Sequence, residues 1–522
     1  VILNIQQIII ELFASNNISY IFKERSCFFM KKLQDYKFWF IVGSQFLYGP
    51  EALKAVEEDA KKMVEGLNAS GKLPAKIEFK AVGTAEVIDR FVMDANYDDT
   101  CAGIITWMHT FSPSKMWIRG LKKLQKPYLH LHTQYNREIP NEEIDMDFMN
   151  LNQSAHGDRE HGFIGTRMRL ARKIVVGYWE TEAVQNKIAT WMRTAIGVIA
   201  SADLKVIRFG DNMRNVAVTE GDKVEAEIKF GWSVNTHAVG DLVQYINAVT
   251  EEQIDAQVAE YKTKYEMNTD NIASVRYQAK VEVAIKKFLE DNKADGFVNT
   301  FEDLYGMDQL PGLATQDLTG QGYGFGPEGD WKIACLTAVM KTMAQGIDKG
   351  TALMEDYTYH FGKDGEDSYN LGAHMLEVCP SVAEGTPKIE VHELGIGGKD
   401  APARLVFEGK AGSAIVATLV DMGGRMRLIV NDVECVKPIM PMPNLPVARV
   451  MWKPMPSLEE AGEAWILAGG AHHSVISYTV TAEQLRDWAN MMGIEFVHIT
   501  KDLDMDKFKD QLMLSDIMWK LK

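Results

Sequence analysis

The chain has 522 residues, 46% of them hydrophobic and 25% charged, so its length predicts about two to four packed domains. No apolar run is long enough to cross a bilayer, and the net charge of −16 would repel phosphate backbones, which excludes membrane and nucleic-acid partners. The five scattered cysteines form no CxxC pair, and this pattern predicts a reducing, cytoplasmic setting without a disulfide framework.

The first 29 residues precede Met30 and differ in character from the rest of the chain. Their apolar cluster at 8–10 stops at Glu11, has no basic region before it and no cleavage site after it, so a secretory signal fits poorly. We interpret residues 1–29 as a non-native leader, with a genuine extension as the alternative.

A first α/β domain is expected over residues 30–203. The run FWFIV at 38–42 has the apolar character of a strand buried on both faces, and helical spacing follows over 52–67. The alternation continues with strands over 76–82, 101–106 and 127–132 and a helix over 85–94. Polar residues follow three of these strands, at Gln45, 107–111 and 132–134. They should face one crevice, because ligands bind beyond the carboxyl ends of parallel strands.

A second α/β domain is expected over residues 204–354, after an amphipathic helix over 183–199. A strand over 204–209 opens it, and the helices that follow are expected over 240–265, 274–291 and 330–346. The predicted third domain, 355–522, contains short β-branched runs at 389–393, 403–407, 414–420 and 426–430, with a hairpin loop at Gly423-Gly424. The predicted fold class is α/β: two open Rossmann-like α/β domains followed by a C-terminal β-rich, barrel-like domain.

Two acidic residues stand out as possible metal ligands. Glu328 lies in the glycine-rich segment 321–332, which lacks the lysine and serine of a phosphate loop. The alternative role for Glu328 or Asp330 is to cap the following helix. Glu355 lies at the mouth of the strand-like run 357–361, and a solvent-facing loop charge is its alternative.

Two histidines complete the candidate set. His374 lies on an apolar stretch, where a hydrogen-bonded core histidine is the alternative, and the pair His472-His473 follows the small residues AGGA. Neighbours on a strand point to opposite faces, so at most one of the pair should enter a given site. Two carboxylates and two imidazoles suit a divalent metal such as manganese, and no GxSxG motif competes with this interpretation.

Long motifs along the chain resemble the bacterial L-arabinose isomerase family. They include VGSQFLYGP at 42–50, MHTFSPSKMW at 108–117, DMDFMNLNQSAHG at 145–157, RFGDNMR at 208–214, GPEGDWK at 326–332, MEDYTYHF at 354–361, AHMLEVCP at 373–380 and AWILAGGAHH at 464–473. The resemblance runs from Lys32 to the C-terminus in the family's order, and only the first 29 residues depart from it.

This resemblance implies an intramolecular oxidoreductase that interconverts L-arabinose and L-ribulose through a metal-stabilised cis-enediol, and also D-galactose and D-tagatose. It implies one Mn²⁺ per subunit, other divalent metals being possible, held by Glu328, Glu355, His374 and His473. Glu328 and Glu355 would also be the catalytic acid and base, and His472 would point away. The implied sugar-binding residues are Gln45, Leu47, Phe111, His156, Met213, Phe301 and Ile396. The apolar side chains at 47, 111, 301 and 396 could equally be core residues.

The resemblance further implies a homohexamer, a dimer of trimers, in which His156 reaches a neighbouring subunit's site. The expected partner is a small aldose or ketose, with no nucleic acid and no membrane. One alternative is an L-fucose-isomerase-like enzyme, which the motifs disfavour. The other is a non-catalytic sugar-binding protein, which would not need two carboxylates on a metal.

Overall fold

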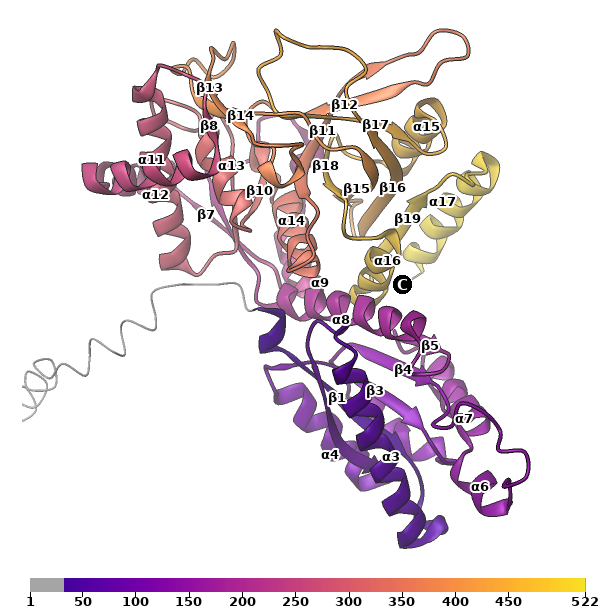
Figure 1. The fold of residues 1–522 in the computed structure, drawn as a ribbon. Coiled ribbons are helices and arrows are strands. Elements are labelled where there is room, and N and C mark those ends of the chain that lie inside the picture. Colours follow the sequence, from indigo (N-terminus) through magenta and orange to yellow (C-terminus); the bar gives the residue numbers. More distant parts are fainter. Residues whose placement is uncertain (1–31, 522) are drawn as a thin grey trace, which may run out of the picture.

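The computed structural model describes residues 32–521, so the interpretation of residues 1–29 lies outside the described part of the chain. Among the described residues, no helix has the length and apolarity needed to span a membrane. The predicted fold class is confirmed: two α/β domains with parallel sheets precede a closed β-barrel (Figure 1).

The N-terminal domain is built on a five-stranded parallel sheet in the order β2-β1-β3-β4-β5. β3 is buried at every residue and β1 at all but Lys37, which explains their uninterrupted apolar sequences. The strands are β1 (Lys37–Gly43), β2 (Lys76–Gly83), β3 (Cys101–Met108), β4 (Tyr128–His132) and β5 (Lys173–Val176). The helices are α3 (Gly49–Ala69), α4 (Ala85–Tyr97), α5 (Ile118–Leu121), α6 (Met146–Leu151), α7 (Ser154–Arg167) and α8 (Glu182–Ala202).

The central domain has a four-stranded parallel sheet in the order β10-β9-β6-β7. Its strands are β6 (Lys205–Phe209), β7 (Ser233–His237), β9 (Gly296–Asn299) and β10 (Gly324–Gly326), and its helices are α9 (Lys223–Phe230), α10 (Val239–Ala248), α11 (Glu251–Lys264), α12 (Ile272–Asn292), α13 (Leu313–Gly320) and α14 (Trp331–Ala344). The single helix expected over 240–265 is wrong. Val249 is extended, and the reciprocal hydrogen bonds of Thr250 and Gln253 begin a separate helix.

Six strands of the C-terminal domain close into a ring in the order β15-β18-β11-β12-β17-β16, and β16 pairs back with β15. They are β11 (Thr351–His360), β12 (Tyr369–Ala373), β15 (Gly412–Asp421), β16 (Met426–Val436), β17 (Arg449–Pro454) and β18 (His473–Ser477). β19 (Glu495–Ile499) pairs parallel with β16, and α15 (Leu458–Ala468), α16 (Ala482–Met492) and α17 (Met505–Lys520) lie outside the ring. The predicted hairpin at Gly423-Gly424 is confirmed, and both glycines have positive φ, 71° and 87°.

Two runs assigned to the barrel-like domain from sequence belong elsewhere. β13 (Lys388–Val391) and β14 (Ala403–Val406) form a three-stranded sheet with β8 (Glu266–Met267) of the central domain. Apolar residues of this hairpin, Ile389 and Leu405, share a core with α11 and α12. The sequence runs were correctly read as strands, but a short β-branched run does not reveal which sheet it joins.

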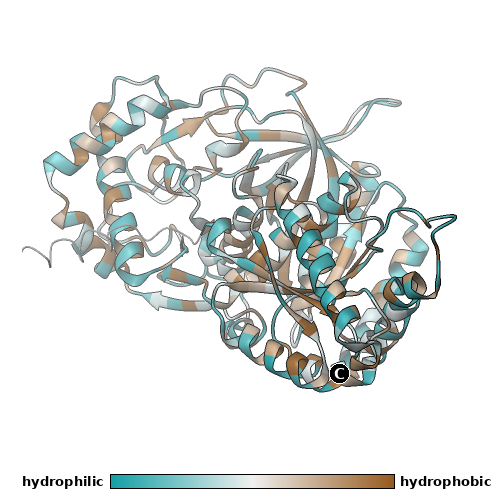
Figure 2. Cartoon of the chain, turned by 60° about the horizontal axis from the view of Figure 1, so that its bottom comes forward, coloured by the Kyte–Doolittle hydropathy of each residue, from teal (hydrophilic) through white to brown (hydrophobic). Residues whose placement is uncertain are grey.

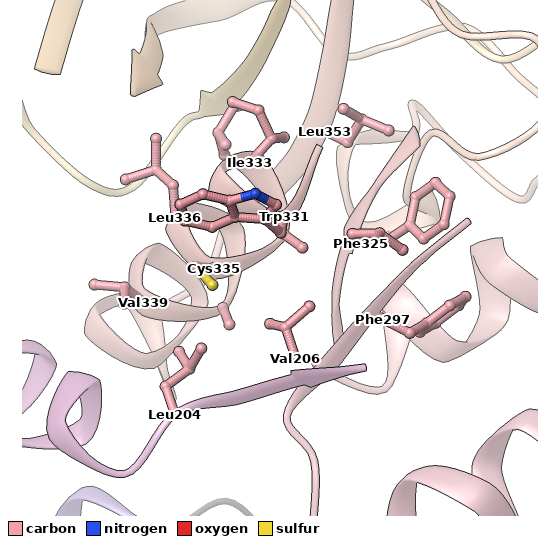
Figure 3. Close-up of a cluster of buried hydrophobic side chains, with 14 of the residues drawn as sticks. Leu204, Val206, Phe297, Phe325, Trp331, Ile333, Cys335, Leu336, Val339 and Leu353 are labelled. Atoms are coloured by element: carbon pink, nitrogen blue, oxygen red, sulfur yellow. The ribbon is translucent and has the colours of Figure 1, made fainter. Parts of the chain in front are cut away.

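Helix α14 links the central sheet to the barrel, because all of its residues are buried. Figure 3 shows its Trp331 and Ile333 among side chains of the central sheet, including Val206 and Phe297, and beside Leu353 of β11. The outer helices show teal and brown along their length in Figure 2, as expected for helices that bury one face. The loop that precedes α14 is therefore held in a fixed position relative to the barrel.

Candidate metal centre and active site

Three of the predicted ligands come from neighbouring barrel strands. Glu355 of β11 lies opposite His473, the first residue of β18, and opposite Ala373, the last residue of β12. Directly opposed residues of an antiparallel pair project to the same face, and His374 follows Ala373 at once. Strand register therefore places Glu355 and His473 on one face, and His374 joins them from just beyond the end of β12: Nε2 of His374 lies 3.9 Å from Oε2 of Glu355, and the rings of His374 and His473 are 5.8 Å apart.

Glu328 reaches the same place from the loop between β10 and α14. Its φ of 56° is left-handed, a conformation that costs a non-glycine residue about 1–3 kcal/mol and persists where the surroundings enforce it. The carbonyl oxygen of Glu328 accepts a 3.0 Å hydrogen bond from the N–H of Met213, and the next residue is packed so closely that a Cβ on Gly329 would lie 2.7 Å from the backbone oxygen of Asp211. Oε2 of Glu328 lies 3.9 Å from Nε2 of His473. This backbone conformation aims the carboxylate at the end of the barrel.

Each predicted histidine ligand has a carboxylate at its other ring nitrogen. Oδ2 of Asp330 lies 3.2 Å from Nδ1 of His473, and Glu377 accepts a hydrogen bond from Nδ1 of His374. The Nε2 atom of His473 is buried and has no hydrogen-bond partner. Metal-binding histidines typically have this arrangement, with one nitrogen held by a carboxylate and the other left for the ion.

The electrostatics of the site reflect this crowding of acids and imidazoles. Burial lowers the pKa of His374, but the carboxylates of Glu377, Glu355 and Glu328 outweigh burial and raise it to about 9. Burial dominates at His473 and lowers its pKa, despite the hydrogen bond to Asp330. Burial raises the pKa of Glu328, but the nearby histidines lower it by more, so that this carboxylate is ionised at neutral pH.

The expectation that His472 points away is wrong. Its Nε2 lies 3.8 Å from Oε2 of Glu328, and donor atoms of Glu328, His472 and His473 all lie within 4.8 Å of one another. Strand alternation does not separate the two histidines, because β18 begins at His473 and His472 is still in the preceding loop. His472 is also the more exposed of the pair.

The donor set fits a divalent cation. Carboxylate oxygens and imidazole nitrogens are ligands for manganese and similar metals, and separations of 3.8–3.9 Å are those of atoms that can bind one ion from different sides. The buried, unpartnered Nε2 of His473 supports the same conclusion, because a buried polar atom normally has a partner. The residues present can therefore hold a metal ion.

A cavity of about 280 Å³ opens beside these ligands and is lined by Glu328, Glu355 and His374. Two of the predicted sugar contacts, Phe301 and Ile396, form part of its apolar wall. Met213 is adjacent, because its backbone N–H donates a 3.0 Å hydrogen bond to the carbonyl oxygen of Glu328.

The other four predicted sugar contacts lie in the N-terminal domain. Gln45 and Leu47 follow β1, Phe111 follows β3, and His156 lies near the start of α7, where its ring stacks on Phe111 at 4.8 Å. In Figure 1 this domain lies below α8, whereas β10, β11, β12 and β18 lie above it. The structure does not bring these four residues to the cavity of the same chain. Leu47 is 84% exposed, so its alternative role as a core residue is wrong.

Sequence reasoning missed the carboxylates behind the histidines. The sequence suggests only a helix-capping role for Asp330; it occupies the N-cap position of α14 but makes no side-chain capping bond. Glu377 was not singled out, although it follows His374 by three residues in a short loop. An acid within a turn of a candidate histidine is the signal that would have found it.

The chain matches family models for the N-terminal, central and C-terminal domains of L-arabinose isomerase over residues 32–203, 205–346 and 350–495. It is 56% identical over 498 residues to an L-arabinose isomerase of Geobacillus kaustophilus (strain HTA426), covering 94% of this chain and 100% of the relative. It is 57% identical over 493 residues to that of Clostridium beijerinckii, with coverages of 94% and 100%. A third relative, from Thermotoga sp. (strain RQ2), is 54% identical over 496 residues, with coverages of 94% and 99%.

Proposed function

The chain belongs to the L-arabinose isomerase family and is an isomerase, and we propose that it interconverts L-arabinose and L-ribulose at the barrel end, with Mn²⁺ as the metal. The observation that carries this proposal is the convergence of Glu328, Glu355, His374 and His473 beside one cavity. The same four residues were expected as ligands from the sequence motifs.

Isomerising an aldose means moving a proton from C2 to C1 and another between the two oxygens, through a cis-enediol of the sugar. A bound divalent ion supplies charge stabilisation for the sugar oxygens. Glu328 and Glu355 flank the cavity and act as the base and acid that carry the carbon-bound proton. The carboxylate of Glu328 is ionised at neutral pH and is therefore in the form that can accept a proton.

The side chains of Phe301 and Ile396 form the apolar wall against which the sugar chain lies. An apolar wall discriminates weakly between substrates that differ by one carbon unit. The proposal therefore includes conversion of D-galactose to D-tagatose at the same site.

The position of Gln45, Leu47, Phe111 and His156 supports an oligomer. These residues are in the N-terminal domain, apart from the chain's own cavity, and Leu47 is largely exposed. We propose a homohexamer, a dimer of trimers, in which they complete the cavity of a neighbouring copy. The proposed location is the cytoplasm, which fits the four free cysteines of the described residues.

The test is ketose formation by the purified protein after chelation, with and without added Mn²⁺, scored by a colour reaction for L-ribulose. Product that depends on Mn²⁺ is the expected result, and L-fucose as a second substrate should give a much lower rate. A folded oligomer that forms no ketose from L-arabinose with any divalent metal would contradict the proposal and favour a sugar-binding protein.

A further inference from the structure

Helix α7 has two faces with different roles. His156, near its start, is exposed, whereas Asp158 and His161 are only 3% and 2% exposed. Both buried side chains lie against β4. The helix that carries a predicted sugar contact is thus attached to the sheet by two polar groups that the proposed reaction does not use.

Asp158 is held by two histidines of β4. Nε2 of His130 and Nδ1 of His132 each lie 2.7 Å from a different oxygen of the Asp158 carboxylate. The two histidines are two residues apart on the strand, so their side chains share the face that meets α7. A buried polar group costs free energy unless it is hydrogen-bonded, and here both oxygens of the carboxylate have a partner.

His161 makes the second attachment, one turn further along α7. Its Nε2 is hydrogen-bonded to the hydroxyl of Tyr128 at 2.5 Å, and that hydroxyl is also bonded to Thr106 of β3 at 2.8 Å. Side chains two residues apart on a strand share one face, so residues 128, 130 and 132 lie on the same face of β4. All three make polar contacts with α7.

These attachments are tied to His156 by close packing at Gly157. A Cβ on Gly157 would lie 2.8 Å from the carbonyl oxygen of Thr110, so the helix rests directly on the loop after β3. The next residue of that loop, Phe111, stacks on the His156 ring. Any shift of α7 along β4 would therefore move His156 relative to Phe111.

We infer that Asp158 is a positioning residue, which fixes α7 on β4 and so sets where His156 stands in the neighbouring subunit's cavity. The inference rests on the proposed function, in which His156 contacts the sugar. The competing view is that Asp158 only stabilises the N-terminal domain. The two roles of Asp158 predict different results. A positioning residue affects substrate binding through His156, whereas a purely stabilising residue has no effect on substrate binding that depends on His156.

The experiment is a double-mutant cycle on the Mn²⁺-loaded enzyme with L-arabinose. Asp158→Ala should raise KM about tenfold, the change expected when a displaced His156 loses its hydrogen bond to the sugar, with a smaller change in kcat. In a His156→Ala background the same substitution should change KM by less than about twofold, because the residue through which it acts is gone. Asp158→Asn retains one acceptor oxygen, so its KM should lie between those of Asp158→Ala and the unsubstituted enzyme. The asparagine variant replaces the alanine variant in the cycle if the latter does not fold.

A control at another aspartate–histidine pair is Asp432→Asn, because Asp432 pairs with His498 at 3.0 Å in the C-terminal domain and does not line the cavity. It should leave KM unchanged. Equal KM effects of Asp158→Ala with and without His156, or no effect in an active enzyme, would overturn the inference alone. An unsubstituted enzyme that does not convert L-arabinose would overturn the proposed function and this inference with it.

Discussion

Nδ1 of His473 lies 3.2 Å from Oδ2 of Asp330, and both residues are completely buried. The carboxylate orients the imidazole so that Nε2, which has no hydrogen-bond partner, faces the carboxylate of Glu328. We expect Asp330→Asn to weaken Mn²⁺ affinity about 10- to 100-fold, the usual cost of losing such an outer partner. Metal titration of the chelated protein measures this, with Glu377→Gln as the equivalent change behind His374. Unchanged affinity in both variants would show that these carboxylates do not support metal ligands.

Glu328 and Glu355 are expected to be needed for turnover itself. Glutamine keeps their shape but removes the proton-accepting charge, so Glu328→Gln and Glu355→Gln should each lower kcat by at least ~10²–10⁴-fold while the protein stays folded. Turnover at saturating L-arabinose and Mn²⁺, with circular dichroism as the folding control, checks this. Near-native activity in either variant would remove that residue from the proposed mechanism.

The two neighbouring histidines are expected to differ in their roles. His473 has a buried, unpartnered Nε2, whereas His472 is 37% exposed at its side chain and lies beside Glu328. His473→Ala should therefore abolish tight Mn²⁺ binding, and His472→Ala should retain it while lowering turnover. Titration of the two variants side by side decides between them. Loss of metal in His472→Ala and its retention in His473→Ala would reverse the assignment.

The fold class could be predicted from the sequence, because the alternation of strands and helices is a local pattern, and the structure brings the four expected ligands together beside one cavity. The sequence did not predict which strands pair in the barrel, and so which distant residues become neighbours. Glu355 and His473 are far apart in sequence and meet only because β11 pairs with β18. The prediction that His472 points away from the site is wrong because side chains alternate between faces only within a strand, and β18 begins at His473. The break between α10 and α11 was readable, since Thr250 and Gln253 have the spacing of a capping box.

The buried carboxyl group of Glu282 predicts how the stability of the folded protein depends on pH. Glu282 is fully buried beside Asp317, and Gln321 donates hydrogen bonds to both carboxyl groups, at 2.9 and 2.8 Å. Burial first, and then the charge of Asp317, raise the pKa of Glu282 well above its usual value. Its contribution to stability is therefore complete below the unfolded pKa of about 4.3 and is lost as pH rises through the folded pKa.

Glutamine resembles the protonated form of Glu282 and should remove this loss. The thermal midpoint of Glu282→Gln should match that of the unsubstituted protein near pH 4 and exceed it increasingly towards pH 8. Thermal unfolding at a series of pH values measures the difference. A midpoint difference that stays constant over this range would mean that Glu282 is ionised in the folded protein throughout.

The proposed sharing of sites between subunits predicts that two defective chains can restore activity to each other. In mixed hexamers of Glu328→Gln and His156→Ala chains, a site with its own Glu328 can receive His156 from a neighbour. Random assortment would repair about one quarter of the sites. Co-expression with two different affinity tags, followed by assay at low L-arabinose, measures this against each homohexamer. The matched control mixes Glu328→Gln with Glu355→Gln, because both residues belong to the same subunit's cavity and no mixed site can contain both. Activity absent from the first mixture would contradict the assignment of His156 to a neighbour's site, and activity restored in the control would contradict the placement of Glu328 and Glu355 in one subunit's cavity.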